Sequence, residues 1–287
     1  MNRKLIKQGG TGLTLYVPKK WVNRLELNPG DEVAVSEDGN NLIIAPQSVL
    51  KEKKIELDAT DLDDNSLRIA LSLIYWQGYN LIEIINKNKF SFVGINKLID
   101  KFTGLVIIDQ KNDKIIIKNS IKEEPKDFDK ILNKLFITVK YMFSLILEGF
   151  NNSFEKNQEI SELRQSILKQ SNYCQKLIFI NNFGKEKTYE YVVLVLMLKK
   201  ISGSLFYLSQ IKEFNLSLEK YFINLFNIFG QLHESFFKQD YKFALRIYEQ
   251  LNKAKDQIYL KTKMPIAMGT LVEHLFSLSL RIVSVFI

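Results

Sequence analysis

The chain has 287 residues, of which 46% are hydrophobic, so it is long enough for two or three domains and apolar enough to bury a real core. Its net charge of +8 and isoelectric point near 9.2 favour anionic partners, although in so lysine-rich a sequence charge alone is weak support for any one of them. A single cysteine, Cys174, excludes an intramolecular disulfide and fits a reducing cytoplasm.

Two further features set expectations for location. The sequence contains no run of 18 uncharged apolar residues, so we expect no membrane-spanning helix and no membrane insertion. Met1 leads directly into a predicted strand, and we therefore expect no signal peptide. Both features predict a cytoplasmic protein.

Residues 1–48 predict two hairpins on either side of one short helix. A first strand runs into a glycine-rich turn at 9–12, where a positive φ is easily adopted. Pro18 marks the start of the helix, N-P-G-D at 28–31 forms a tight turn, and D-G-N-N at 38–41 joins the second pair of strands. Fewer than fifty residues rarely bury enough apolar surface alone, so we expect two copies to interleave their strands.

The first half of this segment is strongly basic. Six cations precede the first acid, Glu26, and this concentration of positive charge predicts a dimer that holds a polyanion. Each cation could instead be an ordinary solvated surface charge. The six are Arg3, Lys4, Lys7, Lys19, Lys20 and Arg24.

Five short stretches carry a family resemblance. They are the L-Y-V-P-K-K-W run at 15–21, Leu25, Leu27, the P-G-D-E-V run at 29–33 and the L-I-I-A-P run at 42–46. The spacing between the V-P-K-x-W element and the G-D-x-V element makes the match specific. On these residues the segment resembles the SpoVT/AbrB/MazE family of swapped-hairpin DNA-binding domains.

The resemblance implies binding of double-stranded DNA by a homodimer, through the basic first strand and loop. Family members that bind DNA often carry a basic residue at the position of Tyr16, so the chain departs from the family pattern there. By position, the resemblance implicates seven residues as DNA contacts: Arg3, Lys4, Lys7, Thr11, Tyr16, Lys19 and Lys20.

Residues 51–120 predict a small α/β domain, because strand and helix patterns alternate along them. We interpret Trp76 and Tyr79 as core or interface aromatics rather than a base-stacking platform. No pattern in this segment indicates catalysis. The predicted elements are a strand at 54–57, a helix capped by Asp63 or Asn65 and ended by Gly78, a strand at 80–86, a helix at 93–102 ended by Gly104, and a hairpin of 105–108 with 115–118.

Residues 126–287 predict an all-helical domain. Apolar residues recur at three- and four-residue spacing, most clearly from Phe128 to Phe150. The pattern gives three long helices in 126–212 and three more in 216–287, so we expect two antiparallel three-helix bundles of similar design. The predicted fold class is thus an α+β N-terminal part, made of a swapped-hairpin β domain and a small α/β unit, followed by an all-α part.

The doubled three-helix pattern, with the segment at 237–244 as a corner between helices, resembles PhoU proteins. The whole layout is similar to an archaeal family of AbrB–PhoU fusions that regulate phosphate uptake. PhoU repeats place acidic residues one helical turn apart, where they share metal ions. This chain has Lys199 and Lys200 where acids are expected, so we expect no metal cluster and no cofactor.

Other candidate ligands and nucleophiles are weak. Glu155 and Glu159, four residues apart, are the weak metal candidates, and a solvated corner is the simpler interpretation. His233 and His274 have no set of partner ligands in the sequence, and we expect them at the edge of the core. Cys174 lies on an apolar stripe and is interpreted as a small buried hydrophobe.

We therefore predict a cytoplasmic transcriptional regulator that binds DNA as a dimer through its basic N-terminal strands. The resemblance implies that it regulates phosphate uptake. The sequence contains no nucleophile elbow, P-loop, H-E-x-x-H or G-x-G-x-x-G context, so we expect no enzymatic activity. The alternative is a PhoU-like adaptor that binds a phosphate transporter or signalling protein and uses its N-terminal module only to dimerise. A third hypothesis is an antitoxin that neutralises a toxin, which the long folded C-terminal part disfavours.

Overall fold

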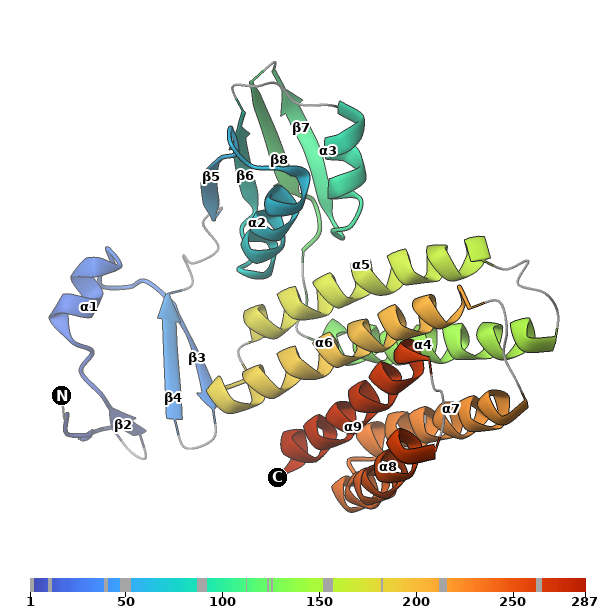
Figure 1. Ribbon diagram of the computed structural model, residues 1–287. Coiled ribbons are helices and arrows are strands. Elements are labelled where there is room, and N and C mark those ends of the chain that lie inside the picture. The colour runs from blue at the N-terminus through green and yellow to red at the C-terminus, as the bar shows by residue number, and fades with distance from the viewer. Residues whose placement is uncertain are drawn as a thin grey trace. The chain divides into compact units, whose positions relative to one another are not determined.

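The computed structural model describes the chain apart from residues 1–2, 10–11, 39–40, 47–52, 87–91, 112, 123, 125, 152–156, 182, 212–215 and 262–264. The chain divides into two compact units, residues 1–52 and residues 53–287. The first unit holds short strands and one short helix, and the second holds a four-stranded sheet with two helices followed by six long helices (Figure 1).

The first unit contains two antiparallel hairpins separated by a short helix, as the sequence predicted. β1 (Ile6–Gln8) pairs with β2 (Gly12–Thr14), and α1 (Lys19–Arg24) follows them. β3 (Val33–Asp38) then pairs with β4 (Asn41–Pro46). The interleaving of two such units belongs to a dimer and stays a prediction.

The tight turn predicted before β3 is confirmed. Gly30 adopts a φ of 99°, a conformation that a residue with a side chain rarely takes. The Asn28 backbone N–H donates to Oδ2 of Asp31 over 2.7 Å, which closes the turn.

The second unit begins with a four-stranded sheet in the order β5-β6-β8-β7. Its strands are β5 (Lys54–Asp58), β6 (Leu81–Ile85), β7 (Leu105–Gln110) and β8 (Lys114–Asn119). β5 and β6 run parallel, whereas β8 pairs antiparallel with both β6 and β7. The strands predicted at 54–57 and 80–86 and the predicted hairpin are confirmed.

Two helices cross between parallel strands of this sheet. α2 (Asp64–Trp76) joins β5 to β6, and α3 (Phe92–Ile99) joins β6 to β7. Such crossovers are right-handed, and both advance in the same direction across the sheet, so both helices cover the same face. Asp63 is the cap residue of α2, since its Oδ1 accepts the Ser66 backbone N–H over 2.7 Å.

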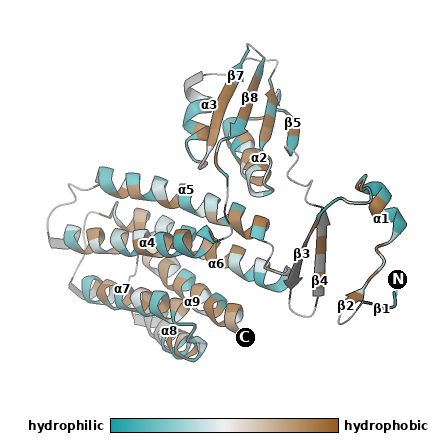
Figure 2. Ribbon diagram, turned by 180° about the vertical axis from the view of Figure 1, so that it is seen from behind, coloured by the Kyte–Doolittle hydropathy of each residue, from teal (hydrophilic) through white to brown (hydrophobic). Residues whose placement is uncertain are grey.

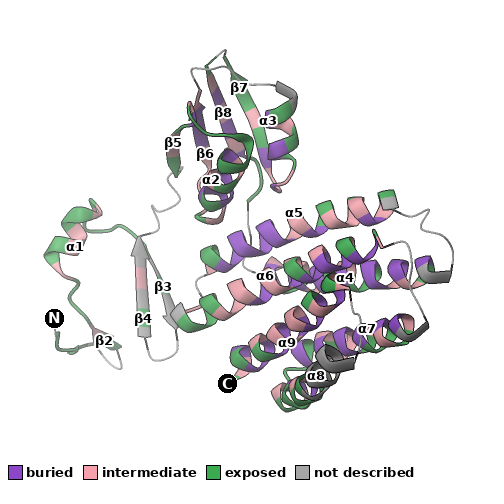
Figure 3. Ribbon diagram, in the orientation of Figure 1, coloured by how far each residue is buried: buried purple, intermediate pink, exposed green. Residues whose placement is uncertain are grey.

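The covered face of the sheet is the core of this part of the chain. The four isoleucines that its two central strands, β6 and β8, direct to this face are fully buried beneath α2 and α3, and these strands are strongly hydrophobic (Figures 2 and 3). Trp76 and Tyr79 pack against this core, which confirms their interpretation as core aromatics. The fully buried isoleucines are Ile82, Ile84, Ile115 and Ile117.

On the opposite face of the sheet, Glu83 forms ion pairs with lysines on both neighbouring strands. Its carboxylate contacts Lys114 of β8 and lies 3.2 Å from Nζ of Lys54 of β5. The hydrogen bond from Lys114, and then that from Lys54, lower the pKa of Glu83. A lowered pKa stabilises the folded state above the ordinary carboxyl pKa, and this contribution is lost as the pH falls through the folded pKa.

Replacing Glu83 by Gln is therefore expected to reduce the acid sensitivity of this sheet. The free energy of unfolding of the unchanged chain should fall as the pH drops below about 4.5, the ordinary glutamate range. The Glu83→Gln variant should be less stable at neutral pH and show a flatter fall in acid. Urea unfolding followed by fluorescence measures both the stability at neutral pH and its fall in acid. In a Trp21→Phe background, Trp76 is the one remaining tryptophan, so the signal reports on α2. The control is Glu56→Gln, because Glu56 is exposed and lies directly opposite Glu83 on the neighbouring strand.

Six long helices complete the second unit, as the sequence predicted. α4, α5 and α6 contact one another, as do α7, α8 and α9, and the two groups meet where α6 contacts α9 and α4 contacts α7 (Figure 1). Aromatic side chains fill the α4–α7 contact, where Phe143 packs against Phe222 and Phe229 at centroid distances of 5.4 and 5.2 Å. The helices are α4 (Asp127–Asn151), α5 (Asn157–Asn181), α6 (Lys185–Leu208), α7 (Leu216–Phe237), α8 (Tyr241–Lys261) and α9 (Ile266–Phe286).

Two of these helices are long and apolar enough to cross a membrane, judged by length and composition alone. They are residues 186–208 of α6 and residues 266–286 of α9, and 44% and 39% of their most hydrophobic windows are buried. The two helices pack against each other, and core helices of globular proteins pass the same test.

The sheet part and the helices of the second unit meet where α2 packs on α5. Nδ2 of Asn172 donates to the Lys101 carbonyl over 3.1 Å, and Nζ of the fully buried Lys176 lies 4.6 Å from the centre of the Tyr75 ring. Ile180 of α5 lies 3.6 Å from where a Cβ would stand on Gly78, which ends α2 with a φ of 75°. α5 is therefore buried on more than one side.

Candidate nucleic-acid interface

The first unit buries none of its described residues. Every side chain described in residues 3–44 is exposed or half-exposed, including apolar residues on all four strands (Figure 3). A folded domain normally conceals such residues, so the described residues of this unit form no core of their own. This agrees with the expectation that a single copy cannot bury enough apolar surface.

Several apolar residues share one face of the second hairpin. Val35 lies opposite Ile44 in the strand register, and Leu42 lies opposite Glu37. Cross-strand partners and alternate residues share a face, so Val33 belongs to the same surface. The exposed fractions of Val33, Val35 and Leu42 are 39%, 56% and 58%. We call these residues, with Ile44, the apolar face of the β3–β4 hairpin.

The first hairpin carries the basic residues together with apolar ones. Lys7 lies opposite Leu13 in the β1–β2 register, so a cation and an exposed leucine share one face. Arg3 and Lys4 precede β1 and are exposed.

A groove of about 400 Å³ lies in this unit between β4, α1 and the segments that precede β1 and α1. Arg3 and Tyr16 line it, so the structure brings two of the predicted DNA contacts together. Its other walls are apolar side chains of the segment before α1, of α1 and of β4, which the sequence did not identify as a common surface. They are Leu15, Val17, Pro18, Trp21, Leu42 and Ile44.

The cations of the first unit are available for an external partner. Lys19 and Lys20 open α1 and are exposed, as are the three cations that precede and form β1. Within the described part of the chain, none of the five forms an ion pair. Thr11, the remaining predicted contact besides Tyr16, lies outside the described residues. An uncompensated basic surface of this kind attracts phosphate groups.

The helices contain weak metal candidates only. Glu155 lies outside the described residues, and Oε1 of Glu159 accepts a hydrogen bond from the Tyr141 hydroxyl over 2.9 Å. Across the described ranges, no three His, Cys, Asp or Glu side chains gather closely enough to hold a metal ion. On α6, Lys200 is exposed and Lys199 is half-buried, at the positions where the PhoU resemblance implies acids.

The two histidines lie at the edge of the core, as expected. Nε2 of His233 is 2.8 Å from Oδ1 of Asn133, and Nδ1 of His274 is 3.1 Å from Oγ of Ser204. Burial lowers the pKa of both, and the nearby Lys140 and Lys200 charges lower it further.

The interpretation of Cys174 is confirmed as well. Its side chain is fully buried on α5, and burial raises the pKa of the thiol. A neutral buried thiol packs as a small hydrophobe and is a poor nucleophile or metal ligand.

Comparison with known proteins finds a match for the first unit. Residues 6–51 match a family described as antidote-toxin recognition MazE, bacterial antitoxin. Neither the comparison with curated proteins nor that with solved structures found a match. The PhoU resemblance of the helices is therefore supported by none of the comparisons. The N-terminal region is similar to antitoxin and DNA-binding domains of the MazE/AbrB type.

Proposed function

We propose that this chain binds double-stranded DNA as a homodimer, through the basic residues of its first unit. The observation that carries the proposal is the match of residues 6–51 to the MazE family, on a unit whose described cations are exposed and unpaired. Domains of this type suggest DNA binding, typically as a dimer.

In the proposed complex, the first hairpins of the two chains contribute cations to one DNA surface. Lys4 and Lys7 contact backbone phosphates, and so does Arg3 from the groove that it shares with Tyr16. Phosphate contacts fix the position of the protein without reading the sequence, which is read by separate contacts to base edges. Tyr16 and Thr11 can contribute such contacts through their hydroxyl groups. Lys19 and Lys20 extend the basic surface along α1.

Within this function we propose a transcriptional regulator of phosphate uptake, acting in the cytoplasm without enzymatic activity. The proposal is supported by the grouping of the six long helices into two mutually contacting sets of three behind a MazE-type domain. In this reading, the second unit senses a signal or docks to a partner, and a change in its conformation alters the geometry of the DNA-binding dimer.

A second candidate function follows from the description of the matched family, which names recognition of a toxin by its antidote. The apolar face of the β3–β4 hairpin and the groove beside α1 offer surface for a protein partner. The PhoU-like adaptor hypothesis also uses this apolar surface for a protein contact. In that hypothesis the contact is with a second copy of the chain, because the first unit serves dimerisation alone.

Binding of the full-length chain to a labelled DNA duplex tests the proposal. We expect the affinity to fall by several powers of ten between about 50 and 200 mM salt, as it does for proteins that neutralise several phosphates. Fluorescence anisotropy at a series of salt concentrations measures this fall. A chain that binds no duplex even at low salt would favour the protein-binding candidates.

A further inference from the structure

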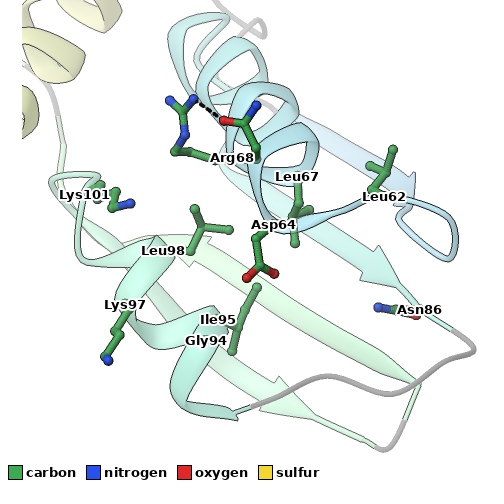
Figure 4. Close-up of a pocket in the computed structure, with 11 residues that line it drawn as sticks. Leu62, Asp64, Leu67, Arg68, Asn86, Gly94, Ile95, Lys97, Leu98 and Lys101 are labelled. Carbon is green, nitrogen blue, oxygen red and sulfur yellow. Dashed lines mark hydrogen bonds between the residues drawn. The ribbon is translucent and has the colours of Figure 1, made fainter.

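A cavity of about 500 Å³ lies between α2 and α3 in the second unit (Figure 4). Asp64 contributes to it from the first turn of α2, just after β5, and Asn86 contributes from the end of β6. In sheets of parallel strands, ligands commonly bind outside the carboxyl ends of the strands, where these two residues stand. The volume is in the range of sites for small molecules.

Three cations line this cavity: Arg68 on α2, Lys97 on α3 and Lys101 just after α3. Lys97 lines the cavity too, but Figure 4 shows its side chain directed away from α2, so Arg68 and Lys101 are considered as the anion-binding pair. Nη2 of Arg68 donates to Oδ1 of Asn65 over 2.7 Å, and this bond fixes the guanidinium without neutralising it. Among the described residues, neither Arg68 nor Lys101 forms an ion pair with a carboxylate.

A further cation increases the positive charge beside the cavity. Lys199 of α6 is half-buried, and its pKa is lowered first by burial and then by the charge of Arg68. Lys199 also forms no ion pair within the described part of the chain. Two uncompensated cations held near each other repel, and an anion placed beside them relieves that repulsion.

The rest of the lining favours an organic ligand over a bare inorganic ion. Leu67, Ile95 and Leu98 are buried residues that supply apolar surface to the cavity. The exposed carboxylate of Asp64 accepts hydrogen bonds and repels a second negative charge. The cavity therefore presents an anion-binding side, an apolar wall and an acceptor for hydroxyl or amino groups.

We propose that this cavity binds a small organic anion, with its phosphate or carboxylate group held by Arg68 and Lys101. The apolar part of the ligand packs on Leu67 and Leu98, and its hydroxyl or amino groups donate to Asp64. The site goes beyond the proposed DNA binding, which uses residues of the first unit only. The backbone beside one of its cations is linked to the long helices, since Nδ2 of Asn172 on α5 donates to the Lys101 carbonyl.

Isothermal titration calorimetry of the full-length chain tests this site. The probes are adenosine monophosphate, fructose 6-phosphate and citrate as organic anions, with adenosine and inorganic phosphate as the neutral and the bare counterparts. We expect at least one organic anion to bind with a Kd below about 1 mM and at least tenfold more tightly than either counterpart. Failure of all three organic anions to bind, or equal binding of inorganic phosphate, would overturn the proposal.

The double variant Arg68→Gln and Lys101→Gln should weaken binding of that anion by about tenfold or more, because charged hydrogen bonds are lost. The control is Lys111→Gln with Lys122→Gln, which removes the same charge from exposed positions of the same unit outside the cavity. It should leave the Kd within about twofold. Equal weakening in both variants would show diffuse attraction and overturn the proposal.

A second variant separates binding from folding. Asp64→Asn changes one exposed side chain and keeps the charge of both cavity cations. It should reduce the preference for the organic anion over inorganic phosphate, because one of the two acceptor oxygens is replaced by an N–H donor and a repulsive charge is removed. An unchanged preference would contradict the assignment of Asp64 to the ligand.

Discussion

Replacing Lys4 and Lys7 by alanine is expected to flatten the salt dependence of duplex binding by about three to four units in the slope of log K against log salt. The double substitution removes four charges from a dimer, and each phosphate contact contributes a slope of about −0.9 because it releases a condensed counterion. Both lysines are exposed and, within the described residues, form no ion pair, so no internal partner loses its charge balance. Anisotropy titrations at several salt concentrations measure the slope.

The matched control replaces Lys130 and Lys134, two exposed lysines on α4, by alanine. It removes the same charge from the second unit, so the slope should stay close to that of the unchanged chain. Equal slopes for the two double variants would mean that DNA is attracted by net charge alone. That result would remove the first unit from its proposed role and favour the adaptor hypothesis.

Replacing Val35 by Asp should convert the dimer into a monomer. Val35 is the centre of the apolar face of the β3–β4 hairpin. Burying a carboxylate there without a partner costs several kcal/mol. A loss of that size is enough to dissociate a dimer of modest affinity. The affinity for DNA should fall by about a hundredfold or more, since one chain keeps half of the phosphate contacts. Sedimentation velocity and anisotropy measure the two effects.

The control for this substitution is Ile137→Asp on α4, where the isoleucine is 52% exposed. It introduces the same charge on an exposed apolar residue of the second unit and should change neither association nor DNA affinity. A Val35→Asp chain that still sediments as a dimer would place the association surface elsewhere.

The unchanged chain should also show a first unfolding transition whose temperature rises with protein concentration.

Local signals in the sequence predicted the elements well because each is controlled by one or two residues. Asp63 caps α2 and Gly78 ends it with a positive φ, so both boundaries depend on side-chain and backbone chemistry that the sequence states directly. The N-P-G-D turn is predictable for the same reason. The helix expected at 93–102 ends earlier, at Ile99, because the chain turns before it reaches Gly104.

The cavity between α2 and α3 could not be predicted in this way. Arg68 and Lys101 are distant in sequence and meet only because two crossovers place their helices on one face of the sheet. The burial of the polar side of α5 could not be predicted either. Asn172 and Lys176 have the pattern of a solvated helix face, but they are buried where α2 packs on α5. Both sites are products of tertiary packing, which periodicity along one helix does not reveal.

The absence of buried residues among those described in the first unit has a consequence for dosage in the cell. If the proposed dimer completes this core, a newly synthesised chain cannot bind DNA until it pairs with a second copy. When the chain is scarce and mostly monomeric, the concentration of dimers grows as the square of the concentration of chains. A twofold rise in synthesis then gives about four times as many DNA-binding dimers. Dilution by growth has the opposite effect with the same steepness.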